Sequence, residues 1–354
     1  MATAQSKEVI RQPVTDSPWP ALVCCIDITH HQLTDTVITR ATGGIMKRFK
    51  NILFFADGSE EMSPALQRAV QLAESNQARL TLVDVIEPVK TPAEITSRFN
   101  IELGELLKQH RKQVLEELSQ SITQGDNLIY IKVLSGLPFV EVIKYVQRGG
   151  FDLLIKMASA PAGISEKLFG SVDLHLLRKC PCPVLIDRPG SSNRYQRILA
   201  AVDTDTSAKQ GCGDLIMQLA SSLREREDAR LDIVHAWQLP YESTLRRGRF
   251  RLADIELQML LKLELERHQA RLQALLEPYG IAIDDENVQL VKGEAAASIN
   301  RVAEQKNSDI IVMGTLGRVG IPGLFIGNTA EEIIQTTKCS VLAVKPTGFI
   351  SPVE

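Results

Sequence analysis

The chain has 354 residues, of which 44% are hydrophobic and 23% charged, and its formal net charge is -3. This length is too great for one typical core and suits two domains of about 150 residues each. The small negative charge argues against nucleic acid or an anionic membrane as a partner. No apolar run approaches the roughly 18 residues that a membrane helix requires, so we predict no membrane span.

The N-terminus has no basic segment followed by an apolar core, so we expect no secretory signal. The six cysteines include no CxxC pair of the kind that binds zinc. Cys180 and Cys182 flank Pro181 ahead of an apolar strand. Burial as small residues is their favoured interpretation, and a redox or metal role is the second. We therefore predict a cytoplasmic chain without a metal site.

Residues 1–45 differ in character from the rest of the chain. Asp16, Pro18 and Pro20 interrupt any helix there, and residues 21–26 form one short apolar run. We expect residues 1–45 to be a weakly structured extension and the functional protein to begin near Met46, whether or not the native protein includes the extension.

From Met46 onward, short apolar strands alternate with helical patterns, which is typical of a parallel sheet covered on both faces. In the first half, the pattern predicts strands over residues 52–56, 78–85, 128–134, 153–157 and 183–186, and helices over 64–75, within 93–121, over 138–148 and around 171–177. In the second half, it predicts strands over residues 198–202, 231–235, 288–291, 310–313 and 341–344, and helices near 207–222, 252–276, 295–304 and 329–336.

The two halves are related by an internal repeat. A constant shift of 157 residues places Gly136 on Gly293, Asp152 on Asp309, Gly170 on Gly327 and Cys182 on Cys339. At the front of each half, a shift of 146 residues aligns residues 51–57 with 197–203, so the second half holds 11 extra residues between the two blocks. This duplication predicts a first domain over residues 46–188, a linker over 189–193, a second domain over 194–347 and a tail over 348–354.

A glycine-containing loop follows the fourth strand of the second half. Met313-Gly314-Thr315-Leu316-Gly317 is followed, after nine further residues, by Gly327-Asn328-Thr329. Glycines allow positive φ and close approach of a ligand to the backbone. A helix that starts at Gly327-Asn328 would offer free N–H groups and its dipole to an anion. Asn328 is also a good N-cap, which is its alternative role.

This spacing resembles the G-2x-G-9x-G-(S/T) motif of the ATP-binding universal stress proteins, with Asn328 where that family usually has Ser or Thr. The resemblance extends from Phe49 to Pro346 and includes Asp57 and Asp203, the acidic residues after each first strand. The runs 152–157, 175–181 and 327–331 look like the tandem, E-type branch of this bacterial family. The resemblance implies an α/β fold of two tandem Rossmann-like open parallel five-stranded sheets, packed as an internal pseudo-dimer through residues 184–186 and 341–344.

The resemblance also implies an adenine-nucleotide site at the switch point between the first and fourth strands of a domain. The implied ligand is ATP, with or without magnesium, in the second domain only, and there is no permanent cofactor. Asp203 would hold the adenine or ribose, unless it is only a turn residue after its strand. The other implied residues line the base pocket (Ala201, Ala236), form the loop (Met313, Gly314, Gly317) and surround the phosphates (Gly327, Asn328, Thr329).

The first half has lost this loop. The shift of 157 residues places Lys156, Met157 and Ala160 on Met313, Gly314 and Gly317. Side chains at the two glycine positions would obstruct the backbone approach that phosphates require, although Gly170 and Ser171 remain. We therefore predict that the first domain binds no ATP.

Three further features have an ordinary interpretation and a more specific one. Four arginines cluster in the extra segment of the second half, and we expect them to lie in a solvated loop, with contact to an anion as the alternative: Arg246, Arg247, Arg249 and Arg251. The leucine-rich helix over residues 252–276 predicts burial against the sheet and a second layer, with the wall of an apolar cavity as the alternative. Glu264 and His268 are one helical turn apart and predict a surface pair rather than half of a metal site.

Three functions are compatible with these residues. The leading one is a non-enzymatic stress protein without catalytic residues, in which a nucleotide governs regulatory or protective interactions. The second is a binding module for a lipid-like or other apolar ligand. The third is an enzyme that hydrolyses ATP or adenylates. No GxxxxGK(S/T) or SGGxDS-type loop is present, and His175 and His235 lack an obvious nucleophile partner, so at most slow turnover is expected. Pairing of two tandem chains into a homodimer stays open.

Overall fold

The computed structural model describes residues 49–58, 63–92, 102–122, 129–159, 169–188, 194–204, 212–247, 252–315 and 327–354. All of these residues belong to one compact unit that spans residues 45–354. The expected extension over residues 1–45 lies outside the described residues.

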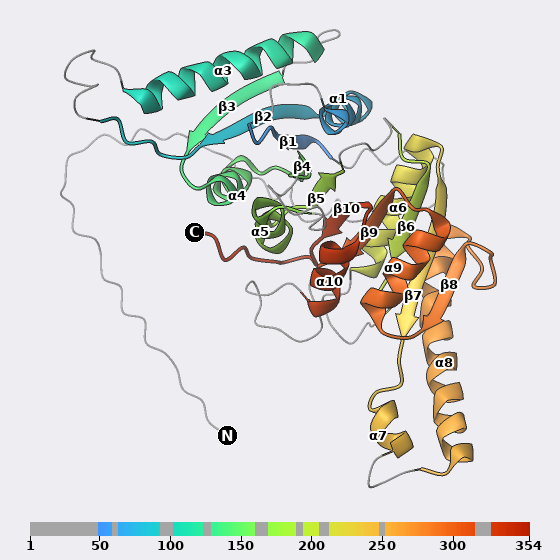
Figure 1. Cartoon of the computed structure of the whole chain (residues 1–354). Coiled ribbons are helices and arrows are strands. Elements are labelled where there is room, and N and C mark those ends of the chain that lie inside the picture. The colour runs from blue at the N-terminus through green and yellow to red at the C-terminus, as the bar shows by residue number, and fades with distance from the viewer. Residues whose placement is uncertain are drawn as a thin grey trace, which may run out of the picture. The chain divides into compact units, whose positions relative to one another are not determined.

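Strands and helices alternate through both halves, close to the predicted ranges (Figure 1). The first half contains β1 (Asn51–Phe55), α1 (Pro64–Asn76), β2 (Arg79–Ile86), α3 (Leu103–Ile122), β3 (Ile129–Ser135), α4 (Pro138–Gly149), β4 (Leu153–Met157), α5 (Ser171–Lys179) and β5 (Val184–Asp187). The second contains β6 (Arg197–Ala201), α6 (Gly213–Glu227), β7 (Arg230–Trp237), α7 (Glu242–Arg247), α8 (Asp254–Leu276), β8 (Val288–Lys292), α9 (Ala295–Lys306), β9 (Ile310–Gly314), α10 (Asn328–Thr336) and β10 (Ser340–Val344).

Two local predictions differ from the structure. Helix α6 begins at Gly213 with Cys212 as its N-cap residue, and the predicted start at residue 207 lies outside the described residues. Gly327 is the N-cap of α10, so Asn328 is the first helical residue and its alternative role as N-cap is wrong. Arg246 and Arg247 lie on the short helix α7 instead of in a loop, while residues 249 and 251 lie outside the described part of the chain.

The ten strands form one sheet in the order β3-β2-β1-β4-β5-β10-β9-β6-β7-β8. Each half contributes five parallel strands, with β1 and β6 at equivalent central positions. The halves join where β5 and β10 pair antiparallel, with Val341 opposite Ile186 and Ala343 opposite Val184. The prediction of two Rossmann-like sheets joined through residues 184–186 and 341–344 is confirmed.

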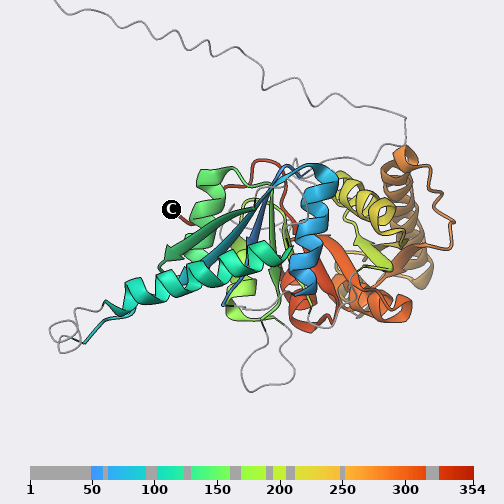
Figure 2. The same cartoon turned by 90° about the horizontal axis from the view of Figure 1, so that it is seen from above.

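Helices cover both faces of this sheet and enclose two apolar cores (Figure 2). Residues of α1, α3, α6 and α8 pack in one core, and residues of α4, α5, α9 and α10 pack in the other. Because both faces are covered, the central strands are mostly apolar; Ile310, Ile311 and Val312 are completely buried. Both cores continue from one half into the other, so the tandem halves share their hydrophobic packing.

Gly136 and Gly293, which the repeat aligns, occupy the same strained position. Both follow the third strand of their half, with φ of 147° and 152°. A Cβ atom at Gly136 would lie 2.6 Å from Cγ of Glu141, and one at Gly293 would lie 2.9 Å from Oγ of Ser298. Glycine is therefore required at both positions by backbone conformation and by space.

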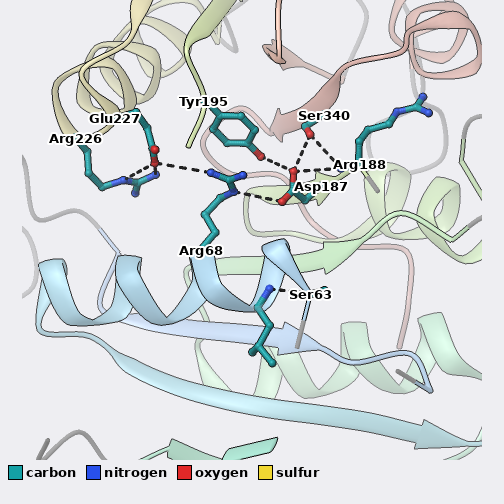
Figure 3. A network of polar contacts seen from close by, with 9 residues as sticks. Ser63, Arg68, Asp187, Arg188, Tyr195, Arg226, Glu227 and Ser340 are labelled. Atoms are coloured by element: carbon teal, nitrogen blue, oxygen red, sulfur yellow. Dashed lines mark hydrogen bonds and ion pairs between the residues drawn. The ribbon is translucent and has the colours of Figure 1, made fainter. Parts of the chain in front are cut away.

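A buried polar network lies where the two halves meet (Figure 3). At its centre, the carboxylate of Asp187 accepts hydrogen bonds from Tyr195 Oη at 2.8 Å, Ser340 Oγ at 2.7 Å and Arg68 Nε at 3.3 Å. The Arg68 guanidinium also stacks 3.7 Å from the centre of the Tyr195 ring and faces Glu227 at 4.0 Å. These contacts join α1 and β5 of the first half to α6 and β10 of the second.

Candidate functional site

The carboxyl ends of β6 and β9 form the switch point of the second half, because β6 pairs with β7 on one side and with β9 on the other. Ala201 is paired with Met313 across these strands, and both side chains are buried. Asp203 follows β6 and is exposed, while Ala236 near the end of β7 is half-buried. The structure thus brings Ala201, Asp203, Ala236 and Met313 to one edge of the sheet.

The two ends of the predicted loop are held together at this edge. The N–H of Thr315 donates to the carbonyl of Val344 at 3.2 Å, and the N–H of Gly327 donates to the carbonyl of Thr315 at 2.9 Å. Gly314 is therefore close to the start of α10. Gly327 and Thr329 are half-buried and Asn328 is exposed, and Gly317 lies outside the described residues.

Gly314 does not use the positive φ that glycine allows, since it is not among the described residues with positive φ. A Cβ atom here would lie 3.4 Å from Cβ and 3.5 Å from Sγ of Cys212, which are ordinary contacts. Neither φ nor packing within the described chain demands glycine at this position, and close approach of a ligand is the role that stays open to it.

In the first half, the carboxylate of an aspartate lies at the equivalent helix end. Asp173, the third residue of α5, accepts through Oδ2 from the N–H of Ser159 at 2.9 Å and from the N–H of Gly170 at 3.1 Å. The shift of 157 residues places Ala330 at this position in the second half. The helix end that could bind an anion thus carries its own carboxylate in the first half and a methyl group in the second.

A buried lysine completes this closed arrangement in the first half. Lys156, the counterpart of Met313, is 1% exposed. Its ammonium group lies 2.6 Å from Oδ2 of Asp57 and 2.8 Å from Oδ1 of Asp173. It also donates to Oγ of Ser159 at 2.6 Å and to the carbonyl of Met157 at 2.9 Å. Asp57, Lys156 and Asp173 are the first-half equivalents of Asp203, Met313 and Ala330. They are therefore joined to one another by ion pairs within the chain.

Comparison with known proteins agrees with the duplicated fold. The universal stress protein family model matches residues 48–188 and again residues 194–345. The chain belongs to the universal stress protein family. It is 27% identical over 317 residues to universal stress protein E of Escherichia coli K12, a match that covers 87% of this chain and 98% of that protein. It is 26% identical over 320 residues to universal stress protein E of Photorhabdus laumondii, covering 87% and 99%. The tandem arrangement is thus of the E type.

A solved structure has the same tandem fold. A protein of unknown function from Pseudomonas aeruginosa PAO1 superposes with a TM-score of 0.62 and 23% sequence identity, over 85% of this chain and 94% of that one. At this level of identity the likeness supports the universal stress protein fold and carries no information on the ligand.

The two universal stress protein domains also differ beside their switch points. In the first, Asp84 at the end of β2 is bound by Arg111 of α3, with 2.8 Å from Nε to Oδ2. His235 has the same place in β7, and the shift of 157 residues places His268 on Arg111. His235 Nδ1 lies 2.9 Å from the carbonyl of Val202, so this nitrogen donates. Its Nε2 lies 2.8 Å from Nδ1 of His268. A histidine pair therefore replaces an ion pair.

One prediction about these histidines is wrong. His268 and Glu264 do pair, with 3.3 Å from Nε2 to Oε1, but His268 is buried, so this is not a surface pair. Oγ1 of Thr204 lies 3.2 Å from Nε2 of His235. The spacing of residues along α8 predicts the pair with Glu264, but it does not show which face of the helix is buried.

Within the described ranges, no group of three or more His, Cys, Asp or Glu side chains could hold a metal ion. No helix in that part of the chain combines the length and apolar character needed to span a lipid bilayer. Cys180 and Cys182 are buried, with their sulfur atoms 3.5 Å apart, and both are free thiols.

Lys156→Met is expected to destabilise the first universal stress protein domain by about 3–5 kcal/mol, because it leaves the carboxylates of Asp57 and Asp173 without their buried cation. The double variant Lys156→Met/Asp173→Ala, which has the residue types of the second domain, should lose clearly less than the sum of the two single changes. Urea unfolding measures all three variants, and Lys112→Met on the exposed face of α3 is the control. Additive effects would contradict the account of a coupled ion cluster.

Proposed function

We propose that this protein binds one adenine nucleotide, ATP, in its second domain and none in its first, and that it acts as a non-enzymatic stress-response regulator or protector through interactions that depend on this ligand. The observation that carries the proposal is the contrast between Asp173 and Ala330. The first domain places the carboxylate of Asp173 at the start of its helix, where it accepts from the N–H of Gly170, whereas Ala330 carries no charge at this position in the second.

The remaining geometry of the second domain supports a nucleotide rather than a bare anion. Ala201 and Met313 provide a buried apolar floor next to Asp203, which suits a base and ribose. The start of α10 and the closed loop beside Gly314 suit the phosphates, since a helix N-terminus offers N–H donors and a favourable dipole. Magnesium would reach the site with the nucleotide, because the proposal assigns no resident metal.

Asp203 and Asp57 supply a matched pair of variants for testing this proposal. Asp203→Ala is expected to weaken ATP binding about tenfold, the effect of removing a hydrogen bond from a charged group to the base or ribose. Asp57→Ala, the same change at the equivalent position of the first domain, should leave ATP affinity unchanged, because that carboxylate is bound to Lys156.

Isothermal titration of the full chain with Mg-ATP measures both affinities and the stoichiometry. A stoichiometry of one with loss of affinity only in Asp203→Ala supports the proposal. Equal loss of affinity in both variants, or loss only in Asp57→Ala, would mean that the first domain takes part in binding ATP. Either result would contradict the proposal.

Binding of an apolar molecule remains a second candidate because of the surface of α8. Several apolar side chains near its N-terminal end are exposed, namely Ile255, Met259, Leu260 and Leu263. These side chains are exposed to solvent, whereas Leu257, Leu272 and Leu276 of the same helix are buried against the rest of the domain. An apolar species that remains bound through purification, together with no uptake of ATP, is the result that favours this candidate.

A further inference from the structure

Lys345 follows β10 and is a second buried lysine at a switch point. It is 5% exposed. Its ammonium group donates hydrogen bonds to Oγ1 of Thr315 and to the carbonyl of Leu177. Thr315 is the residue at which the nucleotide loop closes onto Gly327, and Leu177 lies near the end of α5 in the first domain. One ammonium group thus contacts the loop of one domain and a helix of the other.

The charge of Lys345 is not balanced in the way that the charge of Lys156 is. Lys156 contacts two carboxylates. The partners of Lys345 in the described chain are a hydroxyl, a carbonyl and the Phe349 ring at 5.5 Å. Burying a cation without an anion is costly, and burial lowers the pKa of Lys345 to about 8. An anion held at the adjacent loop would supply the missing opposite charge.

We propose that Lys345 is a positioning residue for the nucleotide phosphates: its ammonium group holds Thr315 at the start of the loop, attracts the phosphate charge, and links occupancy of the second domain to the end of α5 in the first. This inference rests on the proposed function. Lys345 acts through Thr315 and through its charge, without direct contact with the phosphates.

The inference predicts a specific dependence of binding on pH. The titratable groups around the ammonium are the thiols of Cys180, Cys182 and Cys212. A hydrogen bond with Cys180 and burial raise the pKa of Cys182, and burial raises the pKa of Cys212 to about 11. These shifts keep the two thiols neutral at the pH values where Lys345 loses its proton. The last phosphate proton dissociates with a pKa of about 6, so the ligand charge is nearly constant above pH 7.5.

The Lys345 side chain carries a positive charge below about pH 8. It loses its proton, and with it the charge, as the pH rises through that value. ATP affinity of the unmodified chain is expected to fall several-fold between pH 7.5 and pH 9.5. Bound phosphate favours the charged form, so binding near pH 8 should also take up protons from the buffer, which calorimetry in buffers of different ionisation enthalpy measures.

Titrations with Mg-ATP of the full chain and of three variants test the inference. Lys345→Met should weaken binding about tenfold at pH 7.5 and remove the dependence on pH. Lys345→Arg keeps a fixed charge, so it should retain most of the affinity and keep it at pH 9.5.

Arg188→Met is the matched control. Arg188 is the counterpart of Lys345 in the repeat, and its guanidinium binds the carbonyls of Thr337 and Cys339 beyond the end of α10 without contacting Thr315. This variant should lose a similar contact between the domains and leave the ATP affinity within about twofold.

Unchanged affinity and an unchanged pH profile in Lys345→Met would overturn the inference while leaving the proposed function intact. If Lys345→Met does not fold, a flat profile for the unmodified chain between pH 7.5 and pH 9.5 overturns it equally. Absence of ATP binding by the unmodified chain at any pH would reject the proposed function and the inference together.

Discussion

Ala330→Asp is expected to weaken ATP binding at least a hundredfold. The new carboxylate would take the place that Asp173 has at the start of α5, where it accepts from two backbone N–H groups. At the start of α10 it would add a negative charge that repels the phosphates. Two like charges about 4–5 Å apart at the edge of a protein interact with about 3 kcal/mol, which is about a hundredfold in affinity. Titration calorimetry with Mg-ATP measures the loss.

Ala330→Asn is the control for this change, because it adds a side chain of the same shape without the charge. It is expected to weaken binding much less than Ala330→Asp, since an amide carries no charge and does not repel phosphate. Equal losses in both variants would mean that steric obstruction governs the site, and unchanged binding in Ala330→Asp would place the phosphates elsewhere.

Asp187→Asn is expected to lower the free energy of unfolding by about 3–5 kcal/mol. The carboxylate of Asp187 is completely buried and is the closest anion to the guanidinium of Arg68, which is itself buried. Removing one partner of a buried ion pair leaves the other charge uncompensated. Glu227, at 4.0 Å from Arg68, already pairs with Arg226 at 2.9 Å, so it can replace Asp187 only in part. Urea unfolding measures the change.

Glu266→Gln on α8 is the control for Asp187→Asn, because it removes one charge of an exposed pair with Lys262 and should change stability by less than about 0.5 kcal/mol. Near-wild-type stability of Asp187→Asn would show that Tyr195, Ser340 and Glu227 suffice to hold Arg68, and would contradict the central place given to Asp187 between the domains.

The alternation of strands and helices could be predicted because it depends on local patterns. Parallel strands covered on both faces must be apolar along their length, and runs such as residues 310–313 and 341–344 show this directly. The adjacency of the first and fourth strands of a half came from the resemblance to universal stress proteins, and the structure has it in β1 with β4 and in β6 with β9. The antiparallel pairing of β5 and β10 came only from the resemblance, since no local pattern specifies which edges of two sheets meet.

The closed site of the first domain was only half predicted. The sequence indicates that Lys156 and Met157 replace residues of the loop, and from this it predicts obstruction. It does not indicate that Lys156 bridges Asp57 and Asp173, because these three residues lie far apart along the chain and meet only when β1, β4 and α5 pack together. The one available signal was a lysine within an apolar strand, which must find a buried partner.

Lys345 was missed for a similar reason. It follows an apolar strand at a position where a lysine would ordinarily reach solvent. Its burial depends on α5 of the other domain lying against it, which is a consequence of the tandem packing. The same holds for His268, whose burial depends on the face of α8 that packs against β7.

Native mass spectrometry of the full chain with magnesium and ATP decides whether one domain or both bind nucleotide. We expect one added nucleotide per chain at saturation, and none in Ala330→Asp. Two nucleotides per chain would contradict the closed first domain. No nucleotide, or an apolar mass that persists through purification in its place, would contradict the assignment of ATP to the second domain.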